Sequence, residues 1–267
     1  MLSHLPPARR RLVLGLGALL AAGLAAVLAV AALMSLRARS VEVVDQARPG
    51  PVLLVPGYGG SVASLSSLAR FLRASGRDVT VVSLPDRALG DLADQSRVLA
   101  TVVDAVLERT GAGSVDVVGY SAGGVVARLW VTEEGGATQV RRLVTLGSPN
   151  QGTELADLGS LVQGTCPVAC QQLSPSSPVL ARLNAEPLPR GPAYLSLWTT
   201  QDDVVVPPDS AVIPGTPSPS LQSICADSRL RHSGLPDDRL VQRLVAEALG
   251  PGPVPGWGPG DCTRLRS

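Results

Sequence analysis

The feature that most constrains how this chain folds is a five-residue turn, Gly119-Tyr120-Ser121-Ala122-Gly123, between a strand-like run and a helix-like run. Ser114–Val118 before the turn is short and rich in valine, and Val125–Val131 after it is apolar with helical spacing. A serine on a sharp strand-to-helix turn is pushed out of the sheet, and small neighbours avoid clashes with the strand and the helix. Ser121 is therefore the candidate nucleophile, with Gly119 and Gly123 as the glycines of the elbow. A chain with 28 glycines can contain this pattern by accident, so the flanking strand and helix carry the inference.

Strand-like and helix-like runs alternate along most of the chain. The expected strands are Pro51–Val55, Asp78–Leu84, Ser114–Val118, Arg142–Leu146 and Tyr194–Thr199, and the expected helices are Val62–Ala74, Leu92–Arg109, Val125–Thr132 and Asp237–Leu249. Such alternation is typical of a mainly parallel sheet with helices on both faces. We expect one α/β domain over residues 51–249, with its ligand site beyond the carboxyl ends of the strands.

A glycine-rich turn, Pro56-Gly57-Tyr58-Gly59-Gly60, directly follows the first expected strand. Its backbone N–H groups are unshielded and can point at a developing negative charge. A phosphate loop is the competing interpretation, but the turn lacks the lysine and hydroxyl of a Walker motif and the spacing of a dinucleotide fingerprint. With Ser121 as the nucleophile, we expect the N–H groups of Tyr58 and Ala122 to form an oxyanion hole.

Scarcity narrows the choice of a general base, because the chain has two histidines, His4 and His232. His4 precedes the apolar N-terminal run. His232 follows a short strand-like segment, Leu221–Cys225, and precedes the last expected helix, which puts it on a late loop. A lone histidine is often structural, but a nucleophilic serine needs a base, and His232 is the candidate.

The carboxylate that orients this histidine is expected at a strand end between Ser121 and His232 in the sequence. Asp202 and Asp203 directly follow the expected strand Tyr194–Thr199. One of them would orient the imidazole and the other would be a solvated turn residue. Asp209 and Asp227 are the remaining candidates.

The N-terminus predicts export. Residues 1–11 are a basic, cytoplasmic segment ending in three arginines, and the uncharged run 12–36 is long enough to span a bilayer. This run is either an uncleaved transmembrane anchor or a signal peptide, since Ala29-Val30-Ala31 has the small-x-small form of a cleavage site. Residues 37–50 then form a linker, and the rest of the chain lies outside the cytoplasm, anchored or secreted.

All four cysteines lie in the exported part, where oxidation favours pairing over metal binding: Cys166, Cys170, Cys225 and Cys262. Three pairings are possible, and at least one disulfide is expected. The proline-rich and glycine-rich tail, 250–267, has no room for a regular element over Gly250–Gly260, and we expect Cys262 to join it to the body through Cys225.

A net charge of +1 argues against nucleic acid as a partner. We expect no metal and no cofactor, and we expect the protein to be a monomer.

The long stretch Asn150–Pro192 follows a strand at the active edge. It is either a plain surface excursion or a cap that supplies an apolar acyl pocket. The pocket residues expected from the second interpretation are Leu155, Leu158, Leu161 and Val162.

Together these residues resemble the α/β-hydrolase superfamily, and within it the small secreted bacterial lipases. The resemblance covers about Pro51 to Leu249. It rests on the glycine-rich turn at 56–60, the elbow at 119–123, Thr145-Leu146-Gly147-Ser148-Pro149 with Gly152-Thr153, and the segment from Asp202 to His232. It implies a catalytic triad of Ser121, Asp202 and His232 with Tyr58 and Ala122 as oxyanion donors. Many relatives carry histidine where this chain has Pro56, so the oxyanion turn must be supported differently here.

The resulting hypothesis is a serine hydrolase that cleaves carboxylic esters of lipids through an acyl-enzyme, as a lipase or carboxylesterase. Two alternatives stay open. One is an acyltransferase that passes the acyl group to an envelope lipid instead of water. The other is a membrane-anchored binding protein with a hydrolase fold and no turnover.

Overall fold

The computed structural model describes residues 20–30, 44–161 and 166–267. The chain divides into two units, Met1–Glu42 and Val43–Ser267. In the first unit, residues 20–30 are helical and exposed. Across the described residues, no helix combines the length and the apolar character that crossing a membrane requires. Most of the predicted hydrophobic run, 12–36, lies outside the described residues.

Five strands in the described part of the second unit form one parallel sheet in the order β2-β1-β3-β4-β5. They are β1 (Val52–Val55), β2 (Val79–Val81), β3 (Val115–Tyr120), β4 (Val140–Leu146) and β5 (Ala193–Leu197). All five predicted strands are confirmed, with ends that differ by up to three residues. The strand order reverses at β1 and β3, so the connections diverge at their carboxyl ends and leave a crevice where ligands bind in sheets of this type.

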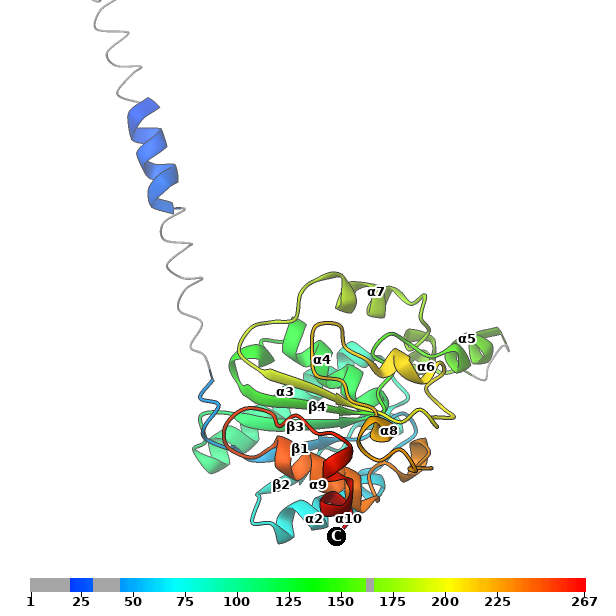
Figure 1. Ribbon diagram of the computed structural model, residues 1–267. Coiled ribbons are helices and arrows are strands. Elements are labelled where there is room, and N and C mark those ends of the chain that lie inside the picture. The colour runs from blue at the N-terminus through cyan, green and yellow to red at the C-terminus, as the bar shows by residue number, and fades with distance from the viewer. Residues whose placement is uncertain (1–19, 31–43, 162–165) are drawn as a thin grey trace, which may run out of the picture. The chain divides into compact units, whose positions relative to one another are not determined.

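Helices cover both faces of the sheet, as Figure 1 shows for α3 and α4 on one side and α2, α9 and α10 on the other. Alternate strand residues supply the two cores: Leu53, Val117 and Leu143 pack with the first group, and Leu54, Val118 and Val144 pack with the second. The helices are η2 (Val62–Leu65), α2 (Ser66–Ala74), η3 (Pro85–Ala88), α3 (Leu92–Thr110), α4 (Ala122–Glu133), η4 (Gly136–Thr138), α5 (Glu154–Leu161), α6 (Val168–Gln172), α7 (Pro178–Ala185), η5 (Pro208–Ala211), α8 (Leu221–Ile224), η6 (His232–Gly234), α9 (Arg239–Ala248), η7 (Pro259–Asp261) and α10 (Cys262–Arg266). The predicted two-faced architecture is confirmed.

The stretch between β4 and β5 is helical where it is described, with α5, α6 and α7 in succession. A disulfide joins Cys166 to Cys170 and so ties the residues just before α6 to the middle of that helix. Ser177 caps α7 by accepting a hydrogen bond from the Leu180 N–H at 3.2 Å. This stretch emerges from the carboxyl end of β4, on the same edge as the serine elbow.

The prediction of a strand-like segment at Leu221–Cys225 is wrong, because this segment forms the helical turn α8. Ser220 accepts a hydrogen bond from the Ser223 N–H at 3.1 Å, which caps a helix start. Leu221 and Ile224 lie three residues apart on one side of this turn, and both are fully buried in the second core. A strand would have pointed them to opposite faces.

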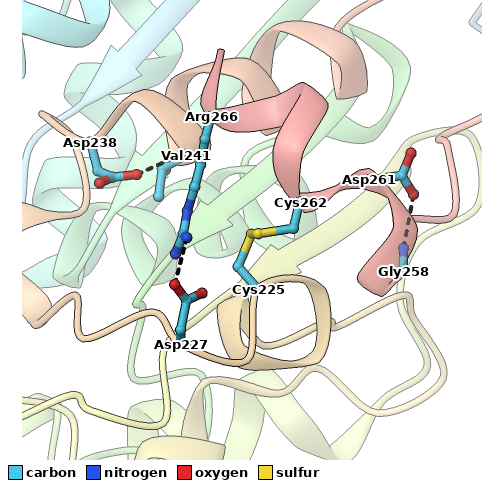
Figure 2. Close-up of a disulfide and its surroundings, with 8 residues drawn as sticks. All are labelled: Cys225, Asp227, Asp238, Val241, Gly258, Asp261, Cys262 and Arg266. Carbon is cyan, nitrogen blue, oxygen red and sulfur yellow. Dashed lines mark hydrogen bonds and ion pairs between the residues drawn. A yellow bond between two sulfur atoms is a disulfide. The ribbon is translucent and has the colours of Figure 1, made fainter.

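The C-terminal segment is packed on the body, as Figure 2 shows around the disulfide between Cys225 and Cys262. Beside the disulfide, Arg266 and Asp227 form an ion pair at 2.8 Å. The prediction that Cys262 pairs with Cys225 is confirmed. The prediction of no regular element over Gly250–Gly260 is wrong at its end, because Pro259 begins η7, where a proline can start a helix without losing a hydrogen bond.

Candidate active site

The candidate nucleophile, Ser121, lies between the end of β3 and the start of α4 with φ +54° and ψ −130°. A residue other than glycine rarely adopts a positive φ, so the neighbouring structure must hold this conformation in place. A Cβ on Gly119 would lie 2.4 Å from the Gly124 Cα, and one on Gly123 would lie 2.3 Å from the Val55 carbonyl oxygen. The small residues of the elbow are therefore required by close backbone approach of strand and helix.

Three predicted side chains meet in one hydrogen-bonded series. The Nε2 atom of His232 lies 3.0 Å from the Ser121 Oγ, and its Nδ1 atom lies 2.8 Å from the Asp202 Oδ2. The side chains of His232 and Asp202 are 6% and 1% exposed, so the imidazole and carboxylate interact away from bulk water. In this geometry an Nδ1–H donates to the carboxylate, which leaves Nε2 to accept the serine proton.

Backbone groups hold the Asp202 carboxylate. Its Oδ1 atom accepts hydrogen bonds from the N–H groups of Val204 at 3.0 Å and Val205 at 2.8 Å. Because both donors bind Oδ1, the other oxygen, Oδ2, is left for His232. The other three candidate acids lie elsewhere: Asp203 pairs with Arg231 at 3.0 Å, Asp227 pairs with Arg266, and Asp209 is exposed in η5.

The glycine-rich turn after β1 lies directly beside the serine. A Cβ on Gly57 would fall 2.7 Å from the Ser121 Cβ. The turn is closed by a hydrogen bond from the Gly60 N–H to the Gly57 carbonyl at 2.9 Å. Among the described residues, no acceptor is assigned to the N–H of Tyr58 or of Ala122. Tyr58 lines the same pocket as Ser121, and Ala122 follows Ser121 in the chain.

Ser121 lines a pocket of about 300 Å³. The other lining residues are Tyr58, Pro149, Thr153, Leu155, Ala156, Cys170, Leu173, Val204 and Val205. Most of them are apolar, and they come from the glycine-rich turn, the stretch after β4 and the loop after β5. Of the four pocket residues expected from sequence, Leu155 lines the pocket, and the side chains of Leu158, Leu161 and Val162 lie outside the described residues.

Two further residues, which the sequence patterns did not identify, support the site. The Tyr120 hydroxyl donates a hydrogen bond to the His232 carbonyl at 3.2 Å, and the two rings lie 5.2 Å apart. Burial, together with the nearby carboxylate of Asp202, raises the pKa of the Tyr120 phenol, so it remains a donor. The Thr153 hydroxyl donates to the Val204 carbonyl at 2.8 Å and accepts from the Val206 N–H at 3.1 Å, which joins two loops. The variable second position of the elbow and the Gly152-Thr153 pair were visible in the sequence, but their partners were not.

Comparison with known proteins finds similarity mainly at the level of structure. A domain of unknown function (DUF7379) matches residues 59–164. Lipase B of Aspergillus fumigatus is 19% identical, with a TM-score of 0.66, and the match covers 81% of this chain and 56% of that one. The mature form of Bacillus licheniformis lipase BlEst2 is 20% identical, with a TM-score of 0.57, and covers 65% of this chain and 83% of that one. MGS-MChE2, an α/β-hydrolase enzyme from lagoon sediments of Mar Chica, Morocco, is 18% identical, with a TM-score of 0.50 and coverages of 71% and 85%.

The parallel sheet, its two helical layers and these structural neighbours establish the α/β-hydrolase fold for this chain. The chain spans little more than half the length of the Aspergillus lipase. At these identities the similarity establishes the fold, and the chemistry must be argued from the site itself.

Proposed function

We propose that this protein is a serine hydrolase of carboxylic esters, a lipase or carboxylesterase acting on acyl lipids. The observation that carries this proposal is the hydrogen-bonded series of Ser121, His232 and Asp202, with its serine at the wall of an apolar pocket. The structural neighbours with the same fold are two lipases and an α/β-hydrolase enzyme, which supports the same conclusion by analogy.

In the proposed reaction, His232 accepts the Ser121 proton as the serine oxygen attacks the ester carbonyl carbon. Asp202 holds the imidazole in the required tautomer and stabilises the imidazolium that forms. His232 then protonates the departing alcohol, which leaves an acyl group on Ser121. Water, deprotonated by the same imidazole, attacks the acyl carbon. The bond to the Ser121 oxygen then breaks, His232 returns the proton to that oxygen, and the acid is released.

The Tyr58 and Ala122 N–H groups form the oxyanion hole in this proposal. They have no assigned acceptor within the described structure, so they need not give up a protein hydrogen bond when the oxyanion develops. Each such donor contributes about 3 kcal/mol to the stabilisation of the transition state. Because backbone groups do this work, side-chain substitutions at Tyr58 should change substrate fit more than the chemical step.

Acyl lipids are the substrates that the pocket favours. Leu155, Leu173 and Val204 offer an apolar wall beside the serine, which suits an acyl chain better than a polar alcohol. Leu155 and Val204 are 44% and 42% exposed, so the apolar surface continues from the pocket to its mouth.

The proposed working compartment is outside the cytoplasm. Both disulfides are of the kind that persists under oxidising conditions. The sequence pattern at the N-terminus supports export with either a membrane anchor or a cleaved signal. We propose that the enzyme acts there as a monomer.

The test is hydrolysis of p-nitrophenyl esters from acetate to palmitate by the full-length protein and its Ser121→Ala variant. Loss of activity in Ser121→Ala, with the fold retained by circular dichroism, supports the proposal, and the preferred chain length separates esterase from lipase. Ser233→Ala is the matched control, since Ser233 is an exposed serine beside the candidate base. Activity that survives in Ser121→Ala, or a folded wild-type protein that cleaves no ester, overturns the proposal.

A further inference from the structure

The opposite, amino edge of the sheet contains an unusual arrangement of charges. β3 and β4 pair with a register shift: Val115 lies opposite Val140, but Asp116 lies opposite Arg142. Arg141 is therefore the extra residue of a β-bulge, and a bulge re-aims the side chains around it. As a result, two consecutive arginines lie opposite one aspartate inside the protein.

The single carboxylate is used by other arginines. Arg141 binds Asp116 through two hydrogen bonds, Nε to Oδ1 at 2.9 Å and Nη2 to Oδ2 at 2.7 Å. Arg77 adds a third, from Nη2 to Oδ2 at 2.5 Å. Both carboxylate oxygens are thereby engaged, so no direct ion pair joins Asp116 to Arg142.

Arg142 is left as a buried cation without a direct ion pair among the described residues. Arg142 is 1% exposed, and within the described ranges no ion pair joins it to a carboxylate. One nitrogen, Nη2, donates to the Gly252 carbonyl, while Nε has no hydrogen-bond partner in the described structure. Burial and the neighbouring Arg141 lower the pKa of Arg142, and the nearby Asp116 carboxylate opposes this shift without cancelling it. A buried, unpaired charge costs free energy that a bound anion would offset.

Arg142 also lines a surface groove of about 840 Å³. The other lining residues are Asp45, Gln46, Ala47, Gly191, Ala193, Tyr194, Gly215, Thr216, Pro217, Gly252, Pro253 and Val254. None of them lines the pocket at Ser121. Most are small or apolar, and the lining carboxylate, Asp45, is already engaged with Arg48 at 3.3 Å and with the Ala47 N–H at 2.9 Å.

We propose that this groove binds an amphiphilic anion, a single carboxylate or phosphate group on an apolar chain, with Arg142 as the anchor of the charged end. A guanidinium with free donors forms strong, charge-assisted hydrogen bonds to either group. The volume lies in the range of small-molecule sites and exceeds what a bare ion needs, and the apolar lining accounts for the rest of the ligand. The proposal does not depend on the chemistry at Ser121.

The experiment is isothermal titration of the full-length protein with four probes: hexanoate, hexyl phosphate, inorganic phosphate and hexanol. We expect the two hexyl anions to bind at least tenfold more tightly than hexanol or inorganic phosphate. Arg142→Met should weaken both anions at least tenfold and leave hexanol unchanged, whereas Arg142→Lys, which keeps the charge, should retain most of the affinity. Tighter binding of hexanoate identifies a fatty carboxylate as the source, and tighter binding of hexyl phosphate identifies a lipid phosphate.

Two more variants separate binding from folding. Ala47 is exposed and lines the groove, so Ala47→Trp should narrow it and weaken both anions without touching Arg142. Arg190→Met removes an exposed arginine that does not line the groove and should leave binding unchanged. The proposal is overturned if hexanol binds as tightly as hexanoate, if inorganic phosphate binds as tightly as hexyl phosphate, or if folded Arg142→Met and Ala47→Trp bind both anions like the wild type. Arg142 would then serve only to hold the Gly252 carbonyl.

Discussion

The two edges of the sheet use buried charge in opposite ways. At the carboxyl edge, Asp202 binds His232, and His232 binds Ser121. The backbone of Ser121 is strained, and this residue lines a pocket. At the amino edge, Asp116 and Arg141 lie inside a cluster that also binds backbone carbonyls before β1 and after α9.

The amino-edge contacts connect segments that are distant in sequence. Arg141 donates to the carbonyls of Gln46, Leu249 and Gly250, and Arg77 donates to those of Gly50 and Leu249. The cluster therefore joins the entry of the domain to the end of α9. The carboxyl edge thus holds the candidate nucleophile in a strained backbone conformation, whereas the polar groups of the amino edge join segments that are distant in sequence.

The largest expected effect is on the carboxyl edge, in Asp202→Asn. An amide at this position favours the wrong imidazole tautomer, so kcat should fall about 10,000-fold with little loss of stability. Ester hydrolysis and thermal unfolding of the same samples measure both. Asp203→Asn is the matched control, because Asp203 makes only an exposed pair with Arg231, and kcat there should change less than about threefold. Equal losses in the two variants would contradict the proposed acid.

On the amino edge, Asp116→Ala should have the reverse signature. It leaves Arg77 and Arg141 without their carboxylate, and removing one partner of a buried pair costs about 3 to 5 kcal/mol. We expect the free energy of unfolding in urea to fall by this amount, while kcat of the folded enzyme stays near wild type. Asp78→Ala, which breaks the exposed pair with Arg109, should cost less than about 1 kcal/mol. A large loss of kcat in folded Asp116→Ala would mean that the two edges are coupled.

The disulfides extend the comparison. Replacing both Cys225 and Cys262 by serine opens a closure of 37 residues and should cost about 4 kcal/mol of unfolding free energy. The same replacement at Cys166 and Cys170 opens a closure of 4 residues and should cost about 2 kcal/mol. Because Cys170 lines the pocket, this second variant should also raise KM for long-chain esters. Urea unfolding and kinetics on both variants measure these effects, and an unchanged KM would show that the shorter disulfide has no part in the pocket.

The smallest expected effect is in Tyr120→Phe, which removes the hydroxyl that bonds the His232 carbonyl and keeps the ring. Loss of one such bond costs about 1 kcal/mol, so kcat should fall about fivefold. Tyr194→Phe removes a similar bond, to the Pro189 carbonyl at 3.0 Å, but away from the site, and should leave kcat unchanged. If both variants behave alike, Tyr120 has no role in positioning the histidine.

Most of the fold was predictable from sequence because strands and helices here follow local patterns. The helix over Leu92–Thr110 was expected within one residue, since Asp91 caps its start through the Ala93 N–H at 2.8 Å and Gly111 ends it with φ +65°. Leu221–Cys225 was predicted wrongly because its composition suits either a strand or a helix, and burial of Leu221 and Ile224 on one side decided between them.

The candidate site divides in the same way. Ser121 and the turn at 56–60 were identified from adjacent residues, because a sharp turn requires small residues next to it in the sequence. Asp202 and Asp203 are equivalent in composition and neighbourhood, and the chain direction after β5 determines which one approaches His232. The partners of Tyr120 and Thr153 lie 112 and 51 residues away, beyond the reach of any local pattern.

By itself, then, the sequence determined the alternation of strands and helices and the strained turn at Ser121, because backbone sterics act locally. It also determined His232 as the candidate base, because histidines are scarce in this chain. Only the tertiary structure decided how the charges are shared. Arg77 and Arg141, which are distant in sequence, both bind Asp116, and a one-residue bulge leaves Arg142 without a direct ion pair to a carboxylate. Pairing of buried charges depends on which side chains the packed sheet brings within hydrogen-bond distance, and that distance exists only after folding.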